Sequence, residues 1–150
     1  MGVDRLRRFL QRHQRLALDT RVFTYPLENN PRYIAFADAF FSWVERSGHE
    51  AGTSTITMTE LLVPSYREED EHRVDEFYGL LSTYPNWRWV APDLETADLA
   101  ARLRADYRLR TPNALQAATA LQAHATGFMT NDPVFARIKE FKTAVLDQFL

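Results

Sequence analysis

Three acidic residues, Asp19, Glu60 and Asp132, follow short apolar segments that lie far apart in the chain. Carboxylates that are brought together repel one another and raise each other's pKa unless a cation lies between them. Oxygen ligands without histidine or cysteine suit Mg²⁺ or Mn²⁺, and such ions polarise phosphodiesters and generate hydroxide for in-line attack. The set therefore predicts a metal-dependent site for phosphodiester chemistry. Taken one at a time, Asp19 and Asp132 are more typical of helix N-caps, and Glu60 of a surface acid.

The elements that must position these acids alternate between strands and helices. Apolar patterning and turn residues predict strands at 15–20, 53–57, 87–90, 127–130 and 144–146. Helical periodicity predicts helices at 31–46, around Glu60, at 70–82 and 94–107, and from an N-cap at Thr111 onward. This alternation predicts a three-layer α/β/α sandwich with a central parallel sheet and right-handed crossovers. Ligands of such sheets bind beyond the carboxyl ends of the strands, where Asp19 and Asp132 are expected.

Composition limits the class of protein. A chain of 150 residues that is 45% hydrophobic predicts one globular domain. No apolar run approaches the roughly 18 residues of a membrane span, and the N-terminus lacks the apolar core of a signal peptide, so we expect a cytoplasmic protein. The absence of cysteine excludes disulfides, a thiol nucleophile and thiolate zinc sites. A serine-hydrolase elbow and a glycine-rich phosphate loop are also missing.

Positive charge is carried almost entirely by arginine, although the net charge is −2. Five arginines lie within residues 1–15, and a second cluster comprises Arg102, Arg104, Arg108 and Arg110. The planar guanidinium suits bidentate phosphate contacts, but each cluster alone is more typical of a solvated helix face. Residues 1–14 form a basic N-terminal extension to a domain over 15–150. The extension is either an amphipathic helix packed through Leu6, Phe9 and Leu10, or a disordered arm that contacts RNA. The acidic run at 68–71 predicts a solvated helix start.

The predicted helix at 31–46 has an unusually broad apolar face that is rich in aromatic residues. Two interpretations stay open from the sequence. The helix is either tucked between the sheet and a neighbouring helix, or it forms a dimer interface or a groove for a partner helix.

Four segments together resemble the ordered motifs of PIN-domain ribonucleases, and the VapC toxins of bacterial toxin–antitoxin pairs in particular. They are LALDTRV at 16–22, TMTELL at 57–62, LRTPNALQAATA at 109–120 and FMTNDPVF at 128–135. The resemblance covers residues 15–150 and implies a PIN-like α/β/α fold. It also implies cleavage of RNA with Mg²⁺ or Mn²⁺, an antitoxin partner whose C-terminal segment covers the site, and a homodimer.

The resemblance also implies roles for individual residues. Asp19 would be the first metal ligand, Glu60 would hold the metal or its water, and Asp132 would lie nearer a second cation position or the outer coordination sphere. Thr20, Thr130 and Asn131 would donate hydrogen bonds around these acids. The arginines at 102, 104, 108 and 110 precede the third motif and would contact RNA phosphates.

This chain departs from the family pattern at Asn113, where the third motif normally has aspartate. An amide oxygen can coordinate a cation, but it brings no negative charge. The loss of one charge near a divalent cation is worth up to about a few kcal/mol at an effective dielectric constant of about 20, or roughly one to three decades of metal affinity. The sequence leaves three alternatives open: an active enzyme that needs more metal or prefers Mn²⁺, a weakened module that binds RNA or a protein, and an inactivating change.

Overall fold

The computed structural model describes residues 2–27 and 31–150, without the side chains of residues 24–27. Its five strands form one sheet in the order β3-β2-β1-β4-β5, and all four pairings are parallel. The strands are β1 Arg15–Leu18, β2 Glu50–Ser54, β3 Trp87–Val90, β4 Gly127–Thr130 and β5 Lys142–Val145. The predicted parallel sheet is therefore confirmed.

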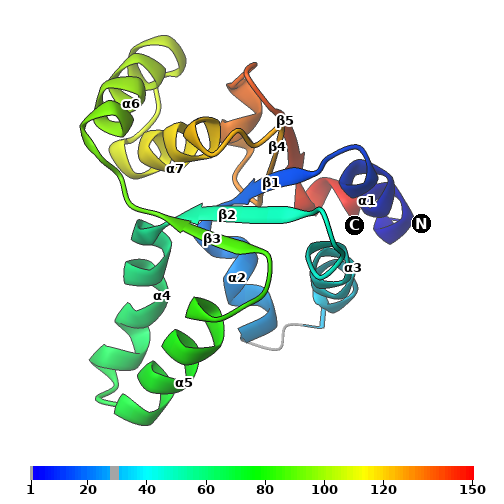
Figure 1. Ribbon diagram of the computed structural model, residues 1–150, viewed down its shortest axis with the longest axis vertical. Helices are drawn as coiled ribbons and strands as arrows, with labels where there is room; N and C mark the ends of the chain where they lie inside the picture. Colours follow the sequence, from blue (N-terminus) through cyan, green and yellow to red (C-terminus); the bar gives the residue numbers. More distant parts are fainter. Residues whose placement is uncertain (1, 28–30) are drawn as a thin grey trace.

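Helices cover both faces of this sheet (Figure 1). Helices α6 and α7 lie on one face, and α2, α3, α4 and α5 lie on the other. Side chains of β1 alternate between the two layers, since Leu16 and Leu18 join the core beside α3 whereas Ala17 joins the core beside α7. The three-layer α/β/α sandwich is confirmed. The helices are α1 Gly2–Gln11, α2 Thr20–Leu27, α3 Ile34–Val44, α4 Thr55–Arg67, α5 Glu71–Ser82, α6 Leu94–Tyr107 and α7 Thr111–Gln122, with short 3₁₀ helices η1 Pro133–Arg137 and η2 Leu146–Phe149.

The predicted bounds are confirmed where the local signals are strong. The bounds of β3, β4 and α6 are those predicted, and α6 begins with a capping box in which Asp93 and Thr96 bond each other's backbone N–H. Helix α7 begins one residue earlier than predicted, since its N-cap is Arg110 rather than Thr111. The Thr111 hydroxyl does not cap the helix, because it accepts a hydrogen bond from the Arg104 guanidinium at 3.0 Å.

The predicted strand at 53–57 is wrong in position. β2 covers residues 50–54, and Thr55 already begins α4, because the Ser54 side chain accepts a 3.2 Å hydrogen bond from the Ile56 N–H and caps that helix. The β-branched residues after Ser54 favour a strand locally, but the cap overrides that preference. The last strand also lies earlier than predicted, at 142–145 rather than 144–146.

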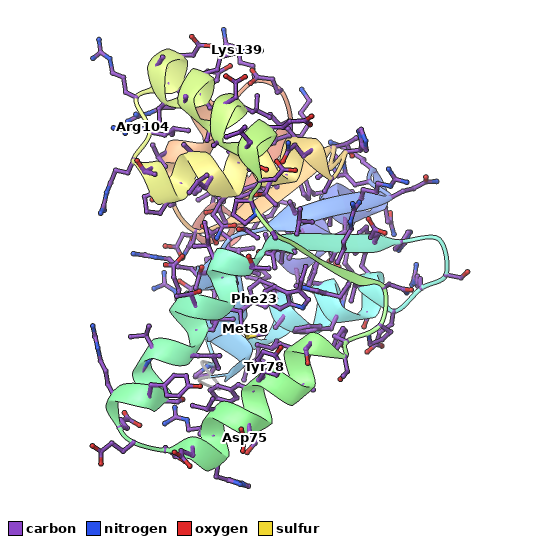
Figure 2. The ribbon with its side chains drawn as sticks, turned by 60° about the vertical axis from the view of Figure 1, so that its left-hand side comes forward. Phe23, Met58, Asp75, Tyr78, Arg104 and Lys139 are labelled. Carbon is purple, nitrogen blue, oxygen red and sulfur yellow. The ribbon has the colours of Figure 1, made fainter. Side chains whose placement is uncertain are left out.

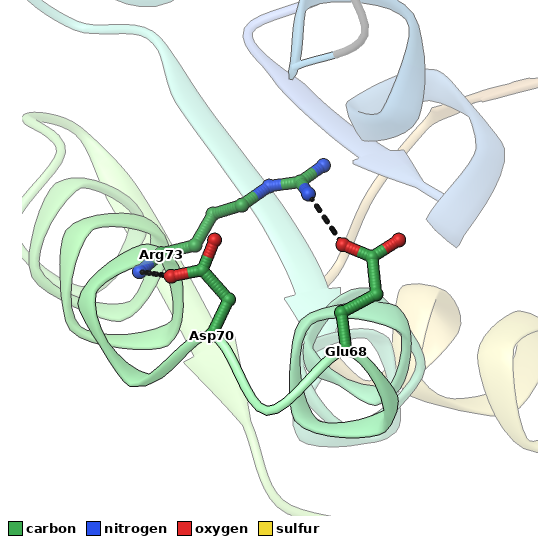
Figure 3. Close-up of polar contacts among 3 residues, drawn as sticks. All are labelled: Glu68, Asp70 and Arg73. Carbon is green, nitrogen blue, oxygen red and sulfur yellow. Dashed lines mark hydrogen bonds and ion pairs between the residues drawn. The ribbon is translucent and has the colours of Figure 1, made fainter.

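The acidic run at 68–71 spans the turn between α4 and α5, and its second half begins α5 as predicted, whereas Glu68 ends α4 (Figure 3). Asp70 is the N-cap of α5, and its Oδ1 accepts a 3.1 Å hydrogen bond from the Arg73 N–H. The Arg73 guanidinium lies 2.9 Å from Oε2 of Glu68, so the same arginine bridges both ends of the turn. Asp70 therefore serves helix capping, and Glu68 serves local ion pairing.

The N-terminal arginine-rich segment is a packed helix rather than a disordered arm. Leu6 and Leu10 of α1 are buried, and α1 lies beside α3 and the C-terminal η2 (Figure 1). Arg5 donates a 3.3 Å hydrogen bond to the Gln148 carbonyl, and its guanidinium lies 5.0 Å from the centre of the Phe149 ring. A Cβ atom at Gly2 would lie 1.6 Å from the Phe149 carbonyl oxygen, so this approach requires glycine.

The broad apolar face of α3 is buried within this chain. Phe36, Phe40 and Trp43 are buried, and the Phe40 ring meets the Trp87 ring of β3 edge-on at 5.8 Å between centroids. Helices α1 and α2 also pack against α3, so burial within the chain explains the breadth of the face without a partner. No helix among residues 2–27 and 31–150 is long and apolar enough to cross a membrane.

Candidate active site

The strand order creates a crevice between β1 and β4. The chain passes from β1 to β2 and β3 on one side, and then returns to place β4 and β5 on the other side of β1. Parallel sheets bind ligands outside the carboxyl ends of the strands at such a reversal, because the two crossover helices diverge there. Asp19 follows β1 at this point, and its backbone N–H donates to the Met129 carbonyl at 3.2 Å. Asp132 lies two residues after β4.

A polar cleft of about 220 Å³ opens at this position. It brings together residues from the ends of β1 and β4, from α4 and from the start of α7. The lining consists of Asp19, Thr20, Arg21, Glu60, Arg110, Pro112, Asn113, Gln116 and Asp132. All three acids that the sequence singled out therefore line one cleft, together with Asn113. As they stand, no three acidic or histidine side chains within the described parts of the chain converge closely enough to hold a metal ion.

Asp19 is the most buried acid of the cleft, with 7% of its surface exposed. Its Oδ2 accepts a 2.5 Å hydrogen bond from the Thr130 hydroxyl, whereas its Oδ1 is buried and has no hydrogen-bond partner among the residues described. Burial raises the pKa of Asp19 to about 6, and the negative charge of Asp132 adds to the rise. The Thr130 hydrogen bond, the positive charge of Arg21 and the nearby Arg21 backbone N–H oppose it. A buried acceptor without a hydrogen-bond partner costs about 1–3 kcal/mol of folding stability, so a ligand that binds Oδ1 of Asp19 would remove this cost.

Thr130 connects the two aspartates of the cleft. Its fully buried hydroxyl donates to Asp19 and accepts a 2.9 Å hydrogen bond from the Asp132 N–H. Asp132 is also the N-cap of η1, because its Oδ1 accepts a 3.0 Å hydrogen bond from the Val134 N–H. The capping interpretation of Asp132 is thus correct, and the same carboxylate also lines the cleft.

Glu60 is exposed on the second turn of α4 and faces the first residue of α2. The Thr20 hydroxyl donates a 3.1 Å hydrogen bond to Oε1 of Glu60. This bond orients a side chain that would otherwise be free to adopt several rotamers. Thr20 therefore acts on Glu60 in the way that Thr130 acts on Asp19.

Asn131 connects segments beside the cleft and is absent from its lining. Its Nδ2 donates to the Tyr33 hydroxyl at 3.3 Å, and its Oδ1 accepts a 2.8 Å hydrogen bond from the Asp147 N–H. The Tyr33 hydroxyl in turn donates to Asp147 at 2.5 Å. These bonds tie the loop that carries Asp132 to the start of α3 and to η2, rather than placing the Asn131 amide among the acids.

Among the four arginines of the second cluster, Arg110 lines the cleft. Arg104 holds the α6–α7 junction, because its guanidinium donates to the Leu109 carbonyl at 2.9 Å and to the Thr111 hydroxyl at 3.0 Å (Figure 2). Arg102 lies 4.0 Å from Asp98 on exposed α6, and Arg108 ends that helix in a left-handed conformation with φ of 55°. These three arginines lie outside the lining.

Three lining residues, Arg21, Pro112 and Gln116, were not identified as site residues from the sequence. Arg21 lies in the first turn of α2, two residues after Asp19, and its charge acts on that carboxylate. Gln116 is buried on α7, and its Oε1 has no hydrogen-bond partner in the described structure. Gln116 follows Asn113 by three residues, a spacing that puts both side chains on one helix face, and this spacing was the available signal.

The donor set of the cleft fits a hard divalent cation. Three carboxylates and two carboxamides contribute oxygen atoms, and neither histidine nor cysteine is present in the lining. The buried, unpartnered Oδ1 of Asp19 gains a partner when a cation binds. The positive charges of Arg21 and Arg110 at the same cleft favour an anionic ligand, such as a phosphate group.

Comparison with known proteins adds the family. The PIN domain family model matches residues 16–141. The fold is similar to that of a chain in a toxin–antitoxin complex from Klebsiella pneumoniae, with a TM-score of 0.64 and 21% identity over 87% of this chain and 97% of that one. It is also similar to a chain of DNA-bound VapBC from Salmonella typhimurium, with a TM-score of 0.67 and 19% identity over 87% and 96%. No curated protein matches the sequence.

Proposed function

This chain belongs to the PIN domain family, and from that premise we propose that it is a Mg²⁺- or Mn²⁺-dependent endoribonuclease, the toxin of a type II toxin–antitoxin pair. The observation that carries the proposal is the buried Asp19 carboxylate at the reversal point of the sheet. It has an unpartnered oxygen and shares a cleft with Glu60 and Asp132. A buried carboxylate oxygen that lacks a partner is most easily explained as a cation ligand.

Asp19, Glu60 and Asp132 would hold the cation, with Asn113 as a neutral oxygen donor at the start of α7. When bound, the cation supplies Lewis-acid polarisation of the phosphodiester and lowers the pKa of water. Thr130 bonds Oδ2 of Asp19 and Thr20 bonds Oε1 of Glu60. Oδ1 of Asp19 is therefore the oxygen that would bind the cation, and Oε2 of Glu60 is the oxygen that would bind the cation or its water.

The other residues of the cleft would bind and orient the RNA. Arg110 and Arg21 offer planar guanidinium groups to the phosphate oxygens, and the first turn of α7 adds the positive end of its dipole. Oε1 of Glu60 accepts from Thr20, so Oε2 is the atom that would take a proton from the attacking water. These contacts would position a phosphodiester next to the acids of the cleft.

An antitoxin protein is the proposed partner, and the cytoplasm is the proposed location. The support is that the similar structures named above come from toxin–antitoxin complexes. A homodimer stays a prediction of the family resemblance, because burial within one chain already accounts for the broad apolar face of α3.

A second candidate function follows from Asn113. This amide lines the cleft where the family pattern has an acid, so the site has one negative charge fewer. A chain that has lost catalysis in this way would still bind RNA or a protein through the same cleft. Cleavage measurements distinguish the two candidates.

The test measures cleavage of a mixed RNA pool by purified protein while Mn²⁺ and Mg²⁺ are titrated, with EDTA as a blank. We expect cleavage that needs the metal and is lost in Asp19→Asn. Asp75→Asn is the matched control, because Asp75 is an exposed acid of α5, remote from the cleft lining (Figure 2). Cleavage that persists unchanged in Asp19→Asn rules out the enzyme proposal, and RNA binding without cleavage favours the second candidate.

A further inference from the structure

Gln116 has a buried polar atom, Oε1, that takes no part in the proposed function. Its side chain is in the wall of the cleft, and only 4% of the residue is exposed. Its Nε2 donates to the Thr57 hydroxyl at 2.8 Å, whereas its Oε1 is buried without a hydrogen-bond partner in the described parts of the chain. Buried polar side chains nearly always have a partner, so an orphaned carbonyl oxygen in a ligand cleft needs an explanation.

The hydrogen bonds around Thr57 determine which side-chain atom of Gln116 is the amide nitrogen and which is the oxygen. The Thr53 hydroxyl donates its only hydrogen to the Leu18 carbonyl at 2.9 Å. The 2.8 Å contact between the Thr53 and Thr57 hydroxyls must then use the hydrogen of Thr57. Thr57 can therefore only accept from Gln116, which places the amide nitrogen against Thr57 and turns Oε1 away from it.

Gln116 reaches the cleft on its acidic side. The Thr57 hydroxyl lies 3.5 Å from the Thr20 hydroxyl, and Thr20 donates to Glu60. The hydroxyl that Gln116 bonds is therefore close to the hydroxyl that orients Glu60, although neither has a hydrogen left for a bond to the other. Asp19 Oδ1 is the other lining atom known to be buried without a partner among the residues described. A cation can satisfy several such oxygen atoms at once.

We propose that Oε1 of Gln116 is a further, neutral ligand of the divalent cation, an inference that rests on the proposed function. Asn113 and Gln116 then offer two carboxamide oxygens from one face of α7, in the same cleft as the carboxylates that follow β1 and β4 and the carboxylate of Glu60 on α4. Hard cations accept carbonyl oxygens alongside carboxylates. The buried amide adds a ligand where the chain lacks the acid at position 113.

The experiment measures Mn²⁺ affinity in the absence of RNA, by electron paramagnetic resonance of the free ion and by the rise in melting temperature with added Mn²⁺. We expect Gln116→Leu to bind Mn²⁺ about tenfold more weakly, because it removes the oxygen, and Gln116→Glu to bind about tenfold more tightly, because it adds a charge. Thr119→Val is the matched control. Thr119 is on the same helix and its hydroxyl is also buried without a partner in the described structure, but it does not line the cleft.

The outcomes separate this inference from the function on which it rests. Affinities of both Gln116 variants equal to that of the unmodified protein overturn the inference and leave the proposed function intact. Failure of the unmodified protein to bind Mn²⁺, or equal binding by Asp19→Asn, overturns the proposed function and the inference together. If Gln116→Leu does not fold, Gln116→Glu decides alone: tighter binding supports the ligand role, and unchanged binding excludes it.

Discussion

The Thr130 hydroxyl lies 2.5 Å from Oδ2 of Asp19 and donates its only hydrogen to that carboxylate. Thr130 ends β4, and Asp19 directly follows the adjacent parallel strand β1, so this contact spans the point at which the sheet reverses its strand order. The same hydroxyl accepts from the Asp132 N–H. One buried threonine therefore sets the geometry of two of the three acids in the cleft.

Thr130→Val is expected to destabilise the protein and to raise the pKa of Asp19 above its value of about 6. Valine keeps the shape of threonine but leaves both the carboxylate and the Asp132 N–H without a partner, at a cost of about 1–3 kcal/mol. Urea denaturation measures the free energy of unfolding, and carbon-detected NMR titration follows Asp19. Thr130→Ser keeps the hydroxyl and should leave the pKa of Asp19 at about 6. An unchanged pKa of Asp19 in Thr130→Val would contradict the prediction.

Asp19→Asn is expected to stabilise the protein near neutral pH while it removes activity. The pKa of Asp19 rises from 3.8 to about 6 on folding, chiefly through burial. Between about pH 4 and pH 6 the folded state holds a proton that the unfolded state has released, so the free energy of unfolding falls as pH rises through this window. The loss, complete above about pH 6, is on the order of 3 kcal/mol.

Denaturation of the two proteins at several pH values tests this linkage. The stability advantage of Asp19→Asn should be absent near pH 4, grow up to about pH 6 and stay constant above it. Asp75→Asn, an exposed substitution, should change stability by less than about 0.5 kcal/mol at every pH. A stability difference that does not depend on pH would show that Asp19 titrates normally in the folded protein.

Asn113→Asp is expected to lower the metal concentration needed for RNA cleavage by roughly ten- to a thousandfold, because it restores one negative charge beside the cation. Metal titration of the initial cleavage rate measures the effect. Gln122→Glu is the control, since it adds the same charge to the other end of α7, outside the cleft lining, and retains an acceptor for the Thr96 hydroxyl. Equal shifts in both variants would point to a general charge effect rather than to ligation.

Leu6→Ala is expected to destabilise the whole protein by about 2–5 kcal/mol, because Leu6 is fully buried in the core that α1 shares with α3. Arg8→Ala, on the exposed side of the same helix, should change the free energy of unfolding by less than about 0.5 kcal/mol. Chemical denaturation compares the two. A small effect of Leu6→Ala would mean that α1, which precedes the segment matching the PIN family model, folds separately from the rest.

The five strands, most of the helices, the parallel sheet and the approach of Asp19, Glu60 and Asp132 to one cleft could be predicted from the sequence. Helix α2 was missed, because its first residue, Thr20, was assigned to the preceding strand. These features depend on apolar periodicity, on turn and capping residues and on a general rule of parallel sheets, all of which act within short segments. The sequence also predicted that Asp132, which follows β4, would be a helix N-cap. It misplaced β2 because the Ser54 cap competes with the β-branched residues that follow, and local preference cannot settle that competition.

Only the tertiary structure decided which neighbours complete the site. Gln116 looks like one more polar residue of a helix, and its role depends on hydroxyl groups from β2 and α4 that lie more than 50 positions earlier in the chain. Asn131 adjoins Asp132 in the sequence, yet its side-chain amide bonds the Tyr33 hydroxyl and the Asp147 N–H, which belong to distant parts of the chain. The sequence by itself determined the fold and the acids at the strand ends, because those signals are local. The partners of each oxygen were decided by long-range packing, because hydrogen bonds depend on distances that only the folded chain defines.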